Sequence, residues 1–184
     1  MDDLGVVTEP GTLRLERLLP GPIERVWAYL TESEKRGQWL ATGPMDLKAG
    51  GGVELHFRHA DLSPTKEPIP AQYKQLENGV TLPGRVVRCD PPRLLTFTWA
   101  HPENSEVTFE LTPKGDKVLL VVTHRRLSDR GGLISVSGGW HTHLDILVER
   151  LNGRTPRPFW SIHEKLAGQY AKRLADAPLA KSGG

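Results

Sequence analysis

Histidine and tryptophan are the side chains with the greatest scope for chemistry in this 184-residue chain, which contains seven histidines and five tryptophans. His143 follows Trp140 by one helical turn and precedes Leu147 by another, so all three share one face of an expected helix. An imidazole on an apolar face needs a polar partner, and it can orient a ligand or move a proton near neutral pH. His143 is therefore either a hydrogen-bonded core histidine or a group that faces a cavity.

Trp99 lies in an extended run in which every second residue shares a face. Leu95, Phe97 and His101 have the same parity as Trp99, so these four side chains should point to one side of a sheet. Because aromatic residues dominate core burial, the tryptophans either fill the core or form walls of a ligand chamber. His101 is either an exposed loop histidine or a residue near the mouth of that chamber.

Spacing gives no support to a metal site or a nucleophile. His141 and His143 are two residues apart on the expected helix and diverge, whereas His56 and His59 fall on opposite faces of an extended strand. Cys89 has no activating base nearby in the sequence. We therefore expect no metal, no cofactor and no catalytic residue.

Asp145 and Glu149 are four residues apart and resemble an acid pair. They lie on the side of the expected helix that is opposite Trp140 and Leu147, which places them toward solvent. Water is therefore their expected partner.

Overall composition excludes several classes of function. Lys and Arg total 24 against 22 Asp and Glu, a balance that gives no electrostatic reason to bind nucleic acid. The single cysteine fits a reducing compartment. Residues 1–10 lack the apolar core of a secretory signal, and no run approaches the roughly 18 apolar residues of a membrane span. A single-domain, soluble, cytoplasmic protein is expected.

The pattern of apolar residues predicts mainly strands, with short helices near the start of the chain. Helical spacing indicates an amphipathic helix from Pro22 to Leu30 and a second short helix within 31–40. The proline-rich segment 60–80 predicts a lid or long surface loop, with a short helix at 71–76. Extended and alternating runs predict strands at 12–19, 45–47, 53–57, 84–89, 94–100, 107–112 and 118–123.

Two helices are expected after the strands. The first covers 137–152 and stops at Asn152-Gly153. The second lies within 154–176 and either packs on the domain or forms a homodimer contact. Residues 1–11 are expected to be a flexible N-terminus and 177–184 a disordered tail, which leaves 12–153 as the folded domain.

An antiparallel sheet that curves around a long helix can leave space between them, which favours a pocket. With this order of elements, the chain resembles the START-like helix-grip superfamily, also called SRPBCC. Within it, the chain is most similar to the branch named for homology to the activator of the heat-shock-protein ATPase. The resemblance covers about 12–153 and is carried by Pro22–Trp27, Trp39-Leu40, Gly50-Gly51, Asp90–Leu94, Phe97–Trp99, Val107–Pro113, Leu120–His124, and Gly139-Trp140 with Leu144.

The resemblance implies an α+β helix-grip fold, with a curved antiparallel sheet of about six strands around a long C-terminal helix, plus an extra terminal helix. It also implies a cavity for an apolar, aromatic or lipid-like small molecule. We expect a non-enzymatic binding domain, with a cyclase or hydrolase that uses His143 or His101, and a chaperone-ATPase activator, as alternatives. The residues expected to line the cavity are Trp39, Phe57, Tyr73, Trp99, Trp140, His143 and Leu147.

Overall fold

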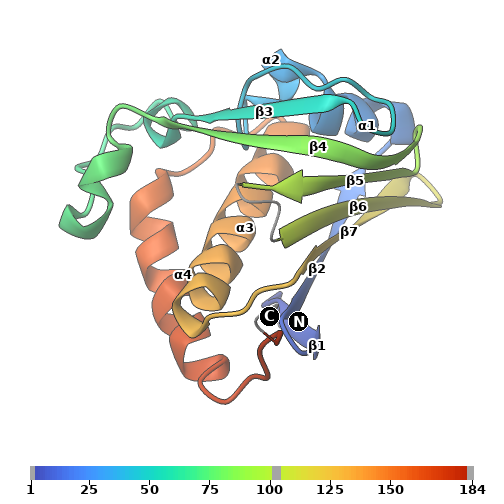
Figure 1. Cartoon of the computed structure of the whole chain (residues 1–184). Helices are drawn as coiled ribbons and strands as arrows, with labels where there is room; N and C mark the ends of the chain where they lie inside the picture. Colours follow the sequence, from blue (N-terminus) through green and yellow to red (C-terminus); the bar gives the residue numbers. More distant parts are fainter. Residues whose placement is uncertain (1–2, 101–104, 182–184) are drawn as a thin grey trace.

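The computed structural model describes residues 3–100 and 105–181, which form an α+β domain (Figure 1). Seven strands make one antiparallel sheet in the order β1-β2-β7-β6-β5-β4-β3. The helix-grip fold expected from the sequence is confirmed, with seven strands in place of the roughly six that the family resemblance implies. The elements are β1 (Val6–Glu9), β2 (Thr12–Pro20), α1 (Ile23–Thr31), α2 (Ser33–Arg36), β3 (Gly52–Phe57), η1 (His59–Asp61), η2 (Ala71–Leu76), β4 (Val80–Asp90), β5 (Leu94–Trp99), β6 (Ser105–Lys114), β7 (Lys117–Arg125), α3 (Arg130–Leu151) and α4 (Phe159–Arg173).

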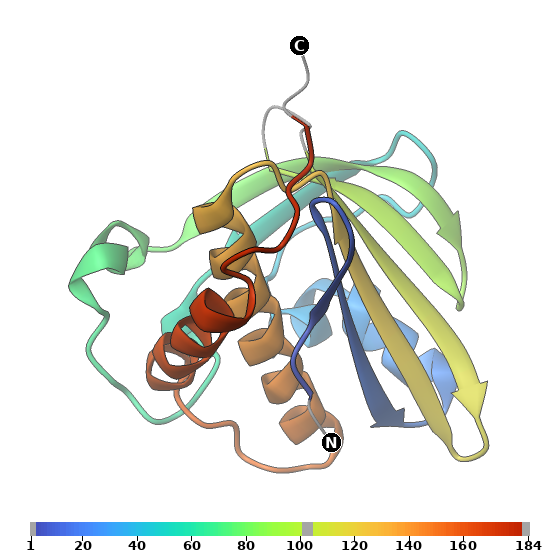
Figure 2. The same cartoon turned by 90° about the horizontal axis from the view of Figure 1, so that it is seen from below.

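The sheet curves around α3, and α4 lies alongside α3 (Figure 2). Strand β6 shows why one face of the sheet turns inward: Val107, Phe109 and Leu111 are buried, whereas the alternating residues Glu110 and Thr112 are exposed. This period of two is the one expected of a strand with one face on the core. The main core therefore lies between the sheet and α3.

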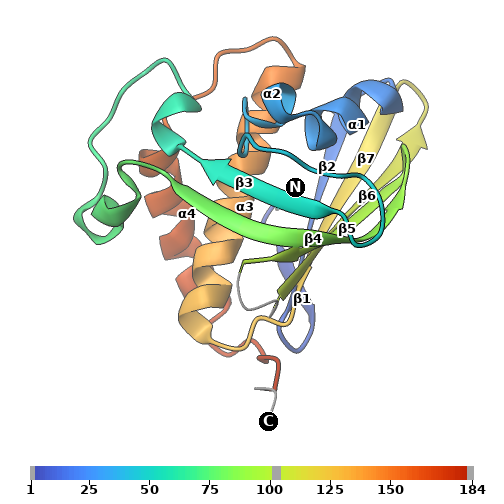
Figure 3. The ribbon, with the colours of Figure 1, turned by 45° about the horizontal axis from the view of Figure 1, so that its top comes forward.

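Helices α1 and α2 lie near the C-terminal end of α3 (Figure 3). Arg25 on α1 donates a hydrogen bond to the carbonyl oxygen of Leu151, the last residue of α3, at 3.0 Å. This bond satisfies one of the carbonyl groups that a helix leaves unpaired at its C-terminus. The two short helices thus close one end of the space that the sheet encloses.

Helix α3 starts earlier than its sequence indicates. It begins at Arg130, and the Asp129 carboxylate accepts a hydrogen bond from the Gly132 backbone N–H at 2.7 Å, as an N-cap does. The glycines at 131–132 and 138–139 weaken the local helical signal, so the sequence indicated a start at Ser137. Packing against the sheet and α4 overrides that local cost and gives α3 two further turns.

Within the described residues, the two terminal segments are more ordered than the sequence predicted. Within residues 1–11, expected to be flexible, strand β1 pairs with β2. Within 177–184, expected to be disordered, the Pro178 carbonyl accepts a hydrogen bond from Gly11 N–H at 2.9 Å, and Ala180 N–H donates to the Leu127 carbonyl at 3.0 Å. These bonds join residues far apart in the sequence, which is why no local pattern reveals them.

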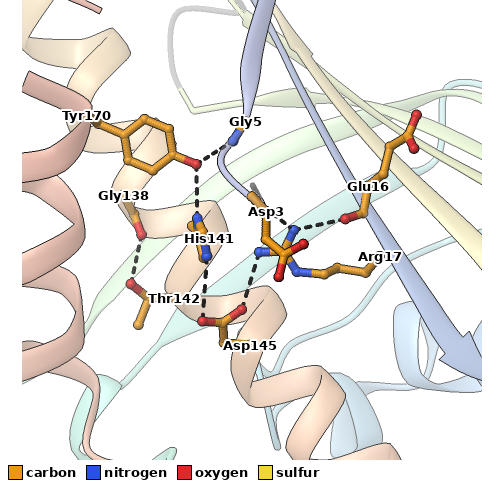
Figure 4. Close-up of polar contacts among 9 residues, drawn as sticks. All are labelled: Asp3, Gly5, Glu16, Arg17, Gly138, His141, Thr142, Asp145 and Tyr170. Atoms are coloured by element: carbon orange, nitrogen blue, oxygen red, sulfur yellow. Dashed lines mark hydrogen bonds and ion pairs between the residues drawn. The ribbon is translucent and has the colours of Figure 1, made fainter. Parts of the chain in front are cut away.

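Asp145 and Glu149, for which the sequence predicts contacts with water, also have charged or polar partners within the chain. Asp145 Oδ1 lies 3.2 Å from Arg17 Nη2, and Asp145 Oδ2 lies 3.6 Å from His141 Nε2 (Figure 4). Glu149 pairs with Arg154 at 2.7 Å. The side chains of Asp145 and Glu149 are 30% and 26% exposed, so both are partly covered by the chain and partly open to solvent.

Tyr170 of α4 completes this network. Its hydroxyl oxygen accepts a hydrogen bond from Gly5 N–H at 2.6 Å and lies 3.0 Å from His141 Nδ1 (Figure 4). A hydroxyl group has one proton and two lone pairs, so the Tyr170 hydroxyl can bond to both neighbours at once. Tyr170 is fully buried, so it ties the N-terminal segment to α3 and α4 through an interior contact.

Two further segments refine the sequence-based prediction. Residues 45–47 form no strand, and an isolated bridge between Met45 and Val53 is the pairing found there. The proline-rich segment 60–80 contains most of η1, all of η2 and the first residue of β4, and its short helix at 71–76 is confirmed. This segment runs from β3 past the start of α4 and back to the sheet.

Candidate functional site

A cavity of about 240 Å³ lies between α3, the first turn of α4, strands β3 to β5 and the segment around η2. Trp140 and His143 of α3 are almost fully buried. About one turn earlier on the helix, Ser135 is exposed and Val136 is half-buried. The cavity therefore opens near the N-terminal half of α3. Its aromatic walls are formed by Phe57, Tyr73, Trp99, Trp140, Phe159 and Trp160.

The aromatic rings contact one another around the cavity. The ring centroids of Trp99 and Trp140 are 5.2 Å apart, and those of Phe57 and Trp99 are 5.7 Å apart. On the opposite wall, Tyr73 stacks on Trp160 with centroids 5.0 Å apart. Such spacings are in the range of attractive aromatic pairs, so the walls hold their shape by mutual contact.

His143 is fixed in one orientation at the inner end of the cavity. Its Nδ1 lies 2.7 Å from the carbonyl oxygen of Trp39. Burial is the main cause that lowers the pKa of His143 to about 3, and the neighbouring His59 lowers it further. The imidazole is therefore neutral at pH 7, with its Nδ1 proton given to Trp39.

Two more histidines line the same cavity. Burial lowers the pKa of His59 to about 4, with a further contribution from His163, and burial also lowers the pKa of His163. The ring of His59 lies 5.5 Å from that of His143 and 4.4 Å from that of Phe159, measured between centroids. The Nδ1 atoms of His59 and His163 are buried and have no hydrogen-bond partner among the described residues. The cavity thus combines aromatic walls with neutral imidazoles.

The lining of the cavity has no formal charge at neutral pH. Among the described residues that line it, none is Lys, Arg, Asp or Glu. No group of three or more His, Cys, Asp or Glu side chains in 3–100 and 105–181 is placed to hold a metal ion. The site is therefore suited to enclosing an uncharged molecule, and the chemistry it offers is that of imidazole nitrogens and aromatic faces.

Five of the seven residues that the sequence singled out lie around this cavity: Phe57, Tyr73, Trp99, Trp140 and His143. Trp39 and Leu147 lie outside its lining and are fully buried in the core. The Trp39 indole N–H donates to the Tyr29 carbonyl at 2.7 Å, and its ring packs against Phe109. Trp39 thus contacts His143 through its backbone carbonyl group.

His101, the other candidate histidine, lies outside the described residues.

Among the histidine and aromatic residues of the lining, sequence reasoning missed four: His59, Phe159, Trp160 and His163. The last three lie in α4, which was interpreted as an appended helix that packs or dimerises. In the structure the apolar face of α4 is buried against its own chain, with Phe159 and Trp160 each at most 6% exposed. The spacing of Phe159, Trp160 and His163, which places them within one turn of a helix, was the available signal.

The segment before β4 is fastened to the start of α4. The Glu67 carboxylate accepts hydrogen bonds from the backbone N–H groups of Trp160 and Ser161, the latter at 3.2 Å. Ser63 donates to the Pro156 carbonyl at 2.9 Å. A carboxylate at a helix N-terminus is favoured by the unpaired N–H groups there. Glu67 therefore holds the outer wall of the cavity in place.

None of the helices in the described parts of the chain is long and apolar enough to cross a membrane.

Comparisons with known proteins agree with this architecture. The model of the family described as "Activator of Hsp90 ATPase homolog 1-like protein" matches residues 20–152. The chain is similar to a protein from Bordetella parapertussis with an NMR structure, with 42% sequence identity and a TM-score of 0.79 over 98% of this chain and 95% of that one. No curated protein matches the chain.

More distant structures share the fold. CalU16 from Micromonospora echinospora is 22% identical, with a TM-score of 0.63 over 94% of this chain and 96% of that one. DynU16, a protein in the dynemicin biosynthetic locus, is 19% identical, with a TM-score of 0.59 over 83% of this chain and 51% of that one. At these identities the similarity is one of fold.

Proposed function

The chain belongs to the Activator of Hsp90 ATPase homolog 1-like family, and on that premise we propose that it is a non-enzymatic domain that binds an apolar or aromatic small molecule. The observation that carries the proposal is the cavity of about 240 Å³, whose described lining is aromatic and aliphatic except for three histidines, Tyr73 and Ser135. Small-molecule sites typically combine such walls with a few polar groups.

The physical gain from binding comes from burial. Apolar surface removed from water contributes about 25 cal/mol per Å². An apolar cavity of about 150 Å³ is known to accept benzene, so the larger cavity of this chain accommodates a molecule of more than one ring. His143 and Tyr73 would orient the polar atoms of such a ligand.

Tryptophan fluorescence tests the proposal. Neutral lipids and polyketide-like aromatic compounds should quench the emission in a saturable manner, because Trp99 and Trp140 line the cavity. Trp99→Phe should reduce the amplitude of quenching. Trp27→Phe is the matched control, since Trp27 lies on α1 outside the cavity lining. Quenching that never saturates, or that is unchanged in Trp99→Phe, would contradict the proposal.

A cyclase or hydrolase is the second candidate, because His143 presents an imidazole to the same cavity. A general base works best when its pKa is near the working pH. The pKa of His143, lowered to about 3 by burial, makes its imidazole a weak base at neutral pH, which favours binding over catalysis. For an enzyme, His143→Ala should abolish turnover and retain ligand binding.

A third candidate follows from the description of the family, which names an activator of the Hsp90 ATPase. An ATPase assay with the cognate chaperone separates this role from ligand binding. Stimulation that saturates with added protein would support it, whereas an unchanged ATPase rate at saturating protein would remove it.

A further inference from the structure

We propose that the ligand of this cavity is a neutral aromatic molecule that carries a hydroxyl group and donates its proton to Nε2 of His143. The inference rests on the proposed binding function and adds the chemical class of the ligand. It sets hydroxylated aromatics apart from fatty acids and other anions, and from aromatics that can only accept hydrogen bonds.

The direction of this hydrogen bond follows from the contact that the other ring nitrogen of His143, Nδ1, makes. A carbonyl oxygen can only accept, so the 2.7 Å contact between His143 Nδ1 and the Trp39 carbonyl places the imidazole proton on Nδ1. In a neutral imidazole the second nitrogen is then an acceptor. His143 Nε2 makes no hydrogen bond to a described residue. It is nevertheless not a fully buried atom, and His143 lines the cavity, so Nε2 is accessible from the cavity.

His163 supplies a second, independent observation. It is 4% exposed, it lines the cavity, and its Nδ1 has no partner in the described chain. His59 Nδ1 is the second buried nitrogen without a partner among the described residues.

Buried polar nitrogens without partners are costly, and a ligand that donates a hydrogen bond to the acceptor Nε2 of His143 supplies a partner where the ring tautomer is set by the Trp39 carbonyl. The walls reinforce the preference, because the faces of Trp99, Trp140 and Phe159 are electron-rich and attract the positive edge of a donor. The cavity is therefore complementary to a molecule that can donate a hydrogen bond.

A charged ligand would lack a counter-ion here. No Lys or Arg in the described lining could pair with a carboxylate, and no Asp or Glu could pair with an ammonium group. Burial keeps His59 and His143 neutral, with pKa values lowered to about 4 and about 3. An unpaired buried charge is strongly unfavourable, so a neutral donor is preferred over either ion.

Three probes that share a naphthalene ring test the inference on the unmodified protein. 2-Naphthol can donate, 2-methoxynaphthalene can only accept, and 2-naphthoate is an anion. Calorimetry and NMR titration should show 2-naphthol binding about tenfold more tightly than 2-methoxynaphthalene, the effect of one hydrogen bond to a buried acceptor. 2-Naphthoate should bind most weakly. The ¹⁵N resonance of His143 Nε2 should shift with 2-naphthol and not with 2-methoxynaphthalene.

The variant His143→Phe should remove the preference for 2-naphthol, and His56→Phe, at an exposed position outside the cavity, should keep it. If His143→Phe does not fold, the comparison of the three probes on the unmodified protein still decides the question. Equal affinities for 2-naphthol and 2-methoxynaphthalene, or tightest binding of 2-naphthoate, would overturn the inference and leave the proposed binding function standing. Failure of all three probes to bind would remove the binding function itself, and the inference with it.

Discussion

Nδ1 of His143 lies 2.7 Å from the carbonyl oxygen of Trp39, a contact between residues 104 positions apart in the sequence. It joins the middle of α3 to the segment that follows α2, and both groups are buried. The same contact fixes which nitrogen of the imidazole carries the proton. One hydrogen bond thus contributes to the stability of the fold and determines what the cavity offers to a ligand.

Removal of this bond should destabilise the protein. His143→Leu leaves the Trp39 carbonyl buried without a donor, which costs about 1–3 kcal/mol. Urea unfolding at pH 7 should show that loss in the free energy of unfolding. His56→Leu, at an exposed position on β3, should change it by less than about 0.5 kcal/mol. A loss in His143→Leu no larger than that in the control would mean that the bond is absent in solution.

Stability should fall as the pH is lowered below about 6.5. Burial lowers the pKa values of His143 and His124 to about 3 and that of His59 to about 4, from an ordinary value near 6.5. In the window between these values the unfolded chain binds more protons than the folded one. The stabilisation is complete above pH 6.5 and is lost as the pH falls through the folded pKa values.

Urea unfolding at a series of pH values between 7 and 4.5 measures this slope. Each proton taken up on unfolding contributes about 1.4 kcal/mol per pH unit. His143→Gln should reduce the slope by about one proton. Leu147→Ala, which loses a buried apolar side chain from the same helix, should lower stability at every pH and keep the slope. A slope that is the same in all three proteins would contradict the assignment of a neutral buried His143.

Tyr170 should control the order of the N-terminal segment. Tyr170→Phe removes the acceptor for Gly5 N–H and the hydrogen-bond partner of His141 Nδ1, at a cost of about 1–3 kcal/mol. Hydrogen exchange of the amides at 5–9 should become faster than in the parent protein. Tyr29→Phe removes a hydroxyl that makes no hydrogen bond to a described residue and should leave that exchange unchanged. Equal exchange in both variants would show that Tyr170 does not anchor β1.

Glu67 should govern access to the cavity. Glu67→Ala deprives the start of α4 of its capping carboxylate, which costs about 1 kcal/mol and loosens the wall that contains Tyr73. Hydrogen exchange at Trp160 and Ser161 should accelerate, and ligand association and dissociation should both become faster. Glu77→Ala, in the same segment, is the control, because the Glu77 side chain is exposed and makes no hydrogen bond or ion pair with a described residue. Unchanged exchange at 160–161 would argue against the cap.

Local sequence patterns were sufficient for most of the sheet and the order of elements. The alternation at Val107, Phe109 and Leu111 identifies a strand with one buried face, and the structure confirms it. The patterns failed where contacts between residues far apart in the sequence determine the structure. The bond from Ala180 to Leu127 orders the C-terminal tail, and no local spacing of residues encodes it.

The candidate site was predictable to the extent that it lies on regular elements. Trp99 and Trp140 share faces with core residues on a strand and a helix, so their approach to the cavity could be inferred. His59 lies directly before the proline-rich segment 60–80, and Trp160 lies on a helix outside the region of the family resemblance. Their positions depend on how α4 packs against α3, which is a tertiary property of the whole chain.

Gly139 gives the most direct test of the cavity, because it lies in its lining and a Cβ atom added there would meet no heavy atom within 4 Å. Gly139→Leu should fill space that a ligand would otherwise occupy. Replacement of an interior helical glycine also stabilises a helix by about 0.5–1 kcal/mol. We therefore expect a more stable protein that binds 2-naphthol at least tenfold more weakly.

Gly168→Leu is the matched control for that variant. Gly168 lies within α4 at an exposed position, and a Cβ atom added there also meets nothing within 4 Å. It should give a similar rise in the free energy of unfolding with no change in affinity. If both variants gain stability and neither loses affinity, the ligand does not occupy the space beside Gly139, and the cavity between α3 and the sheet is not the binding site.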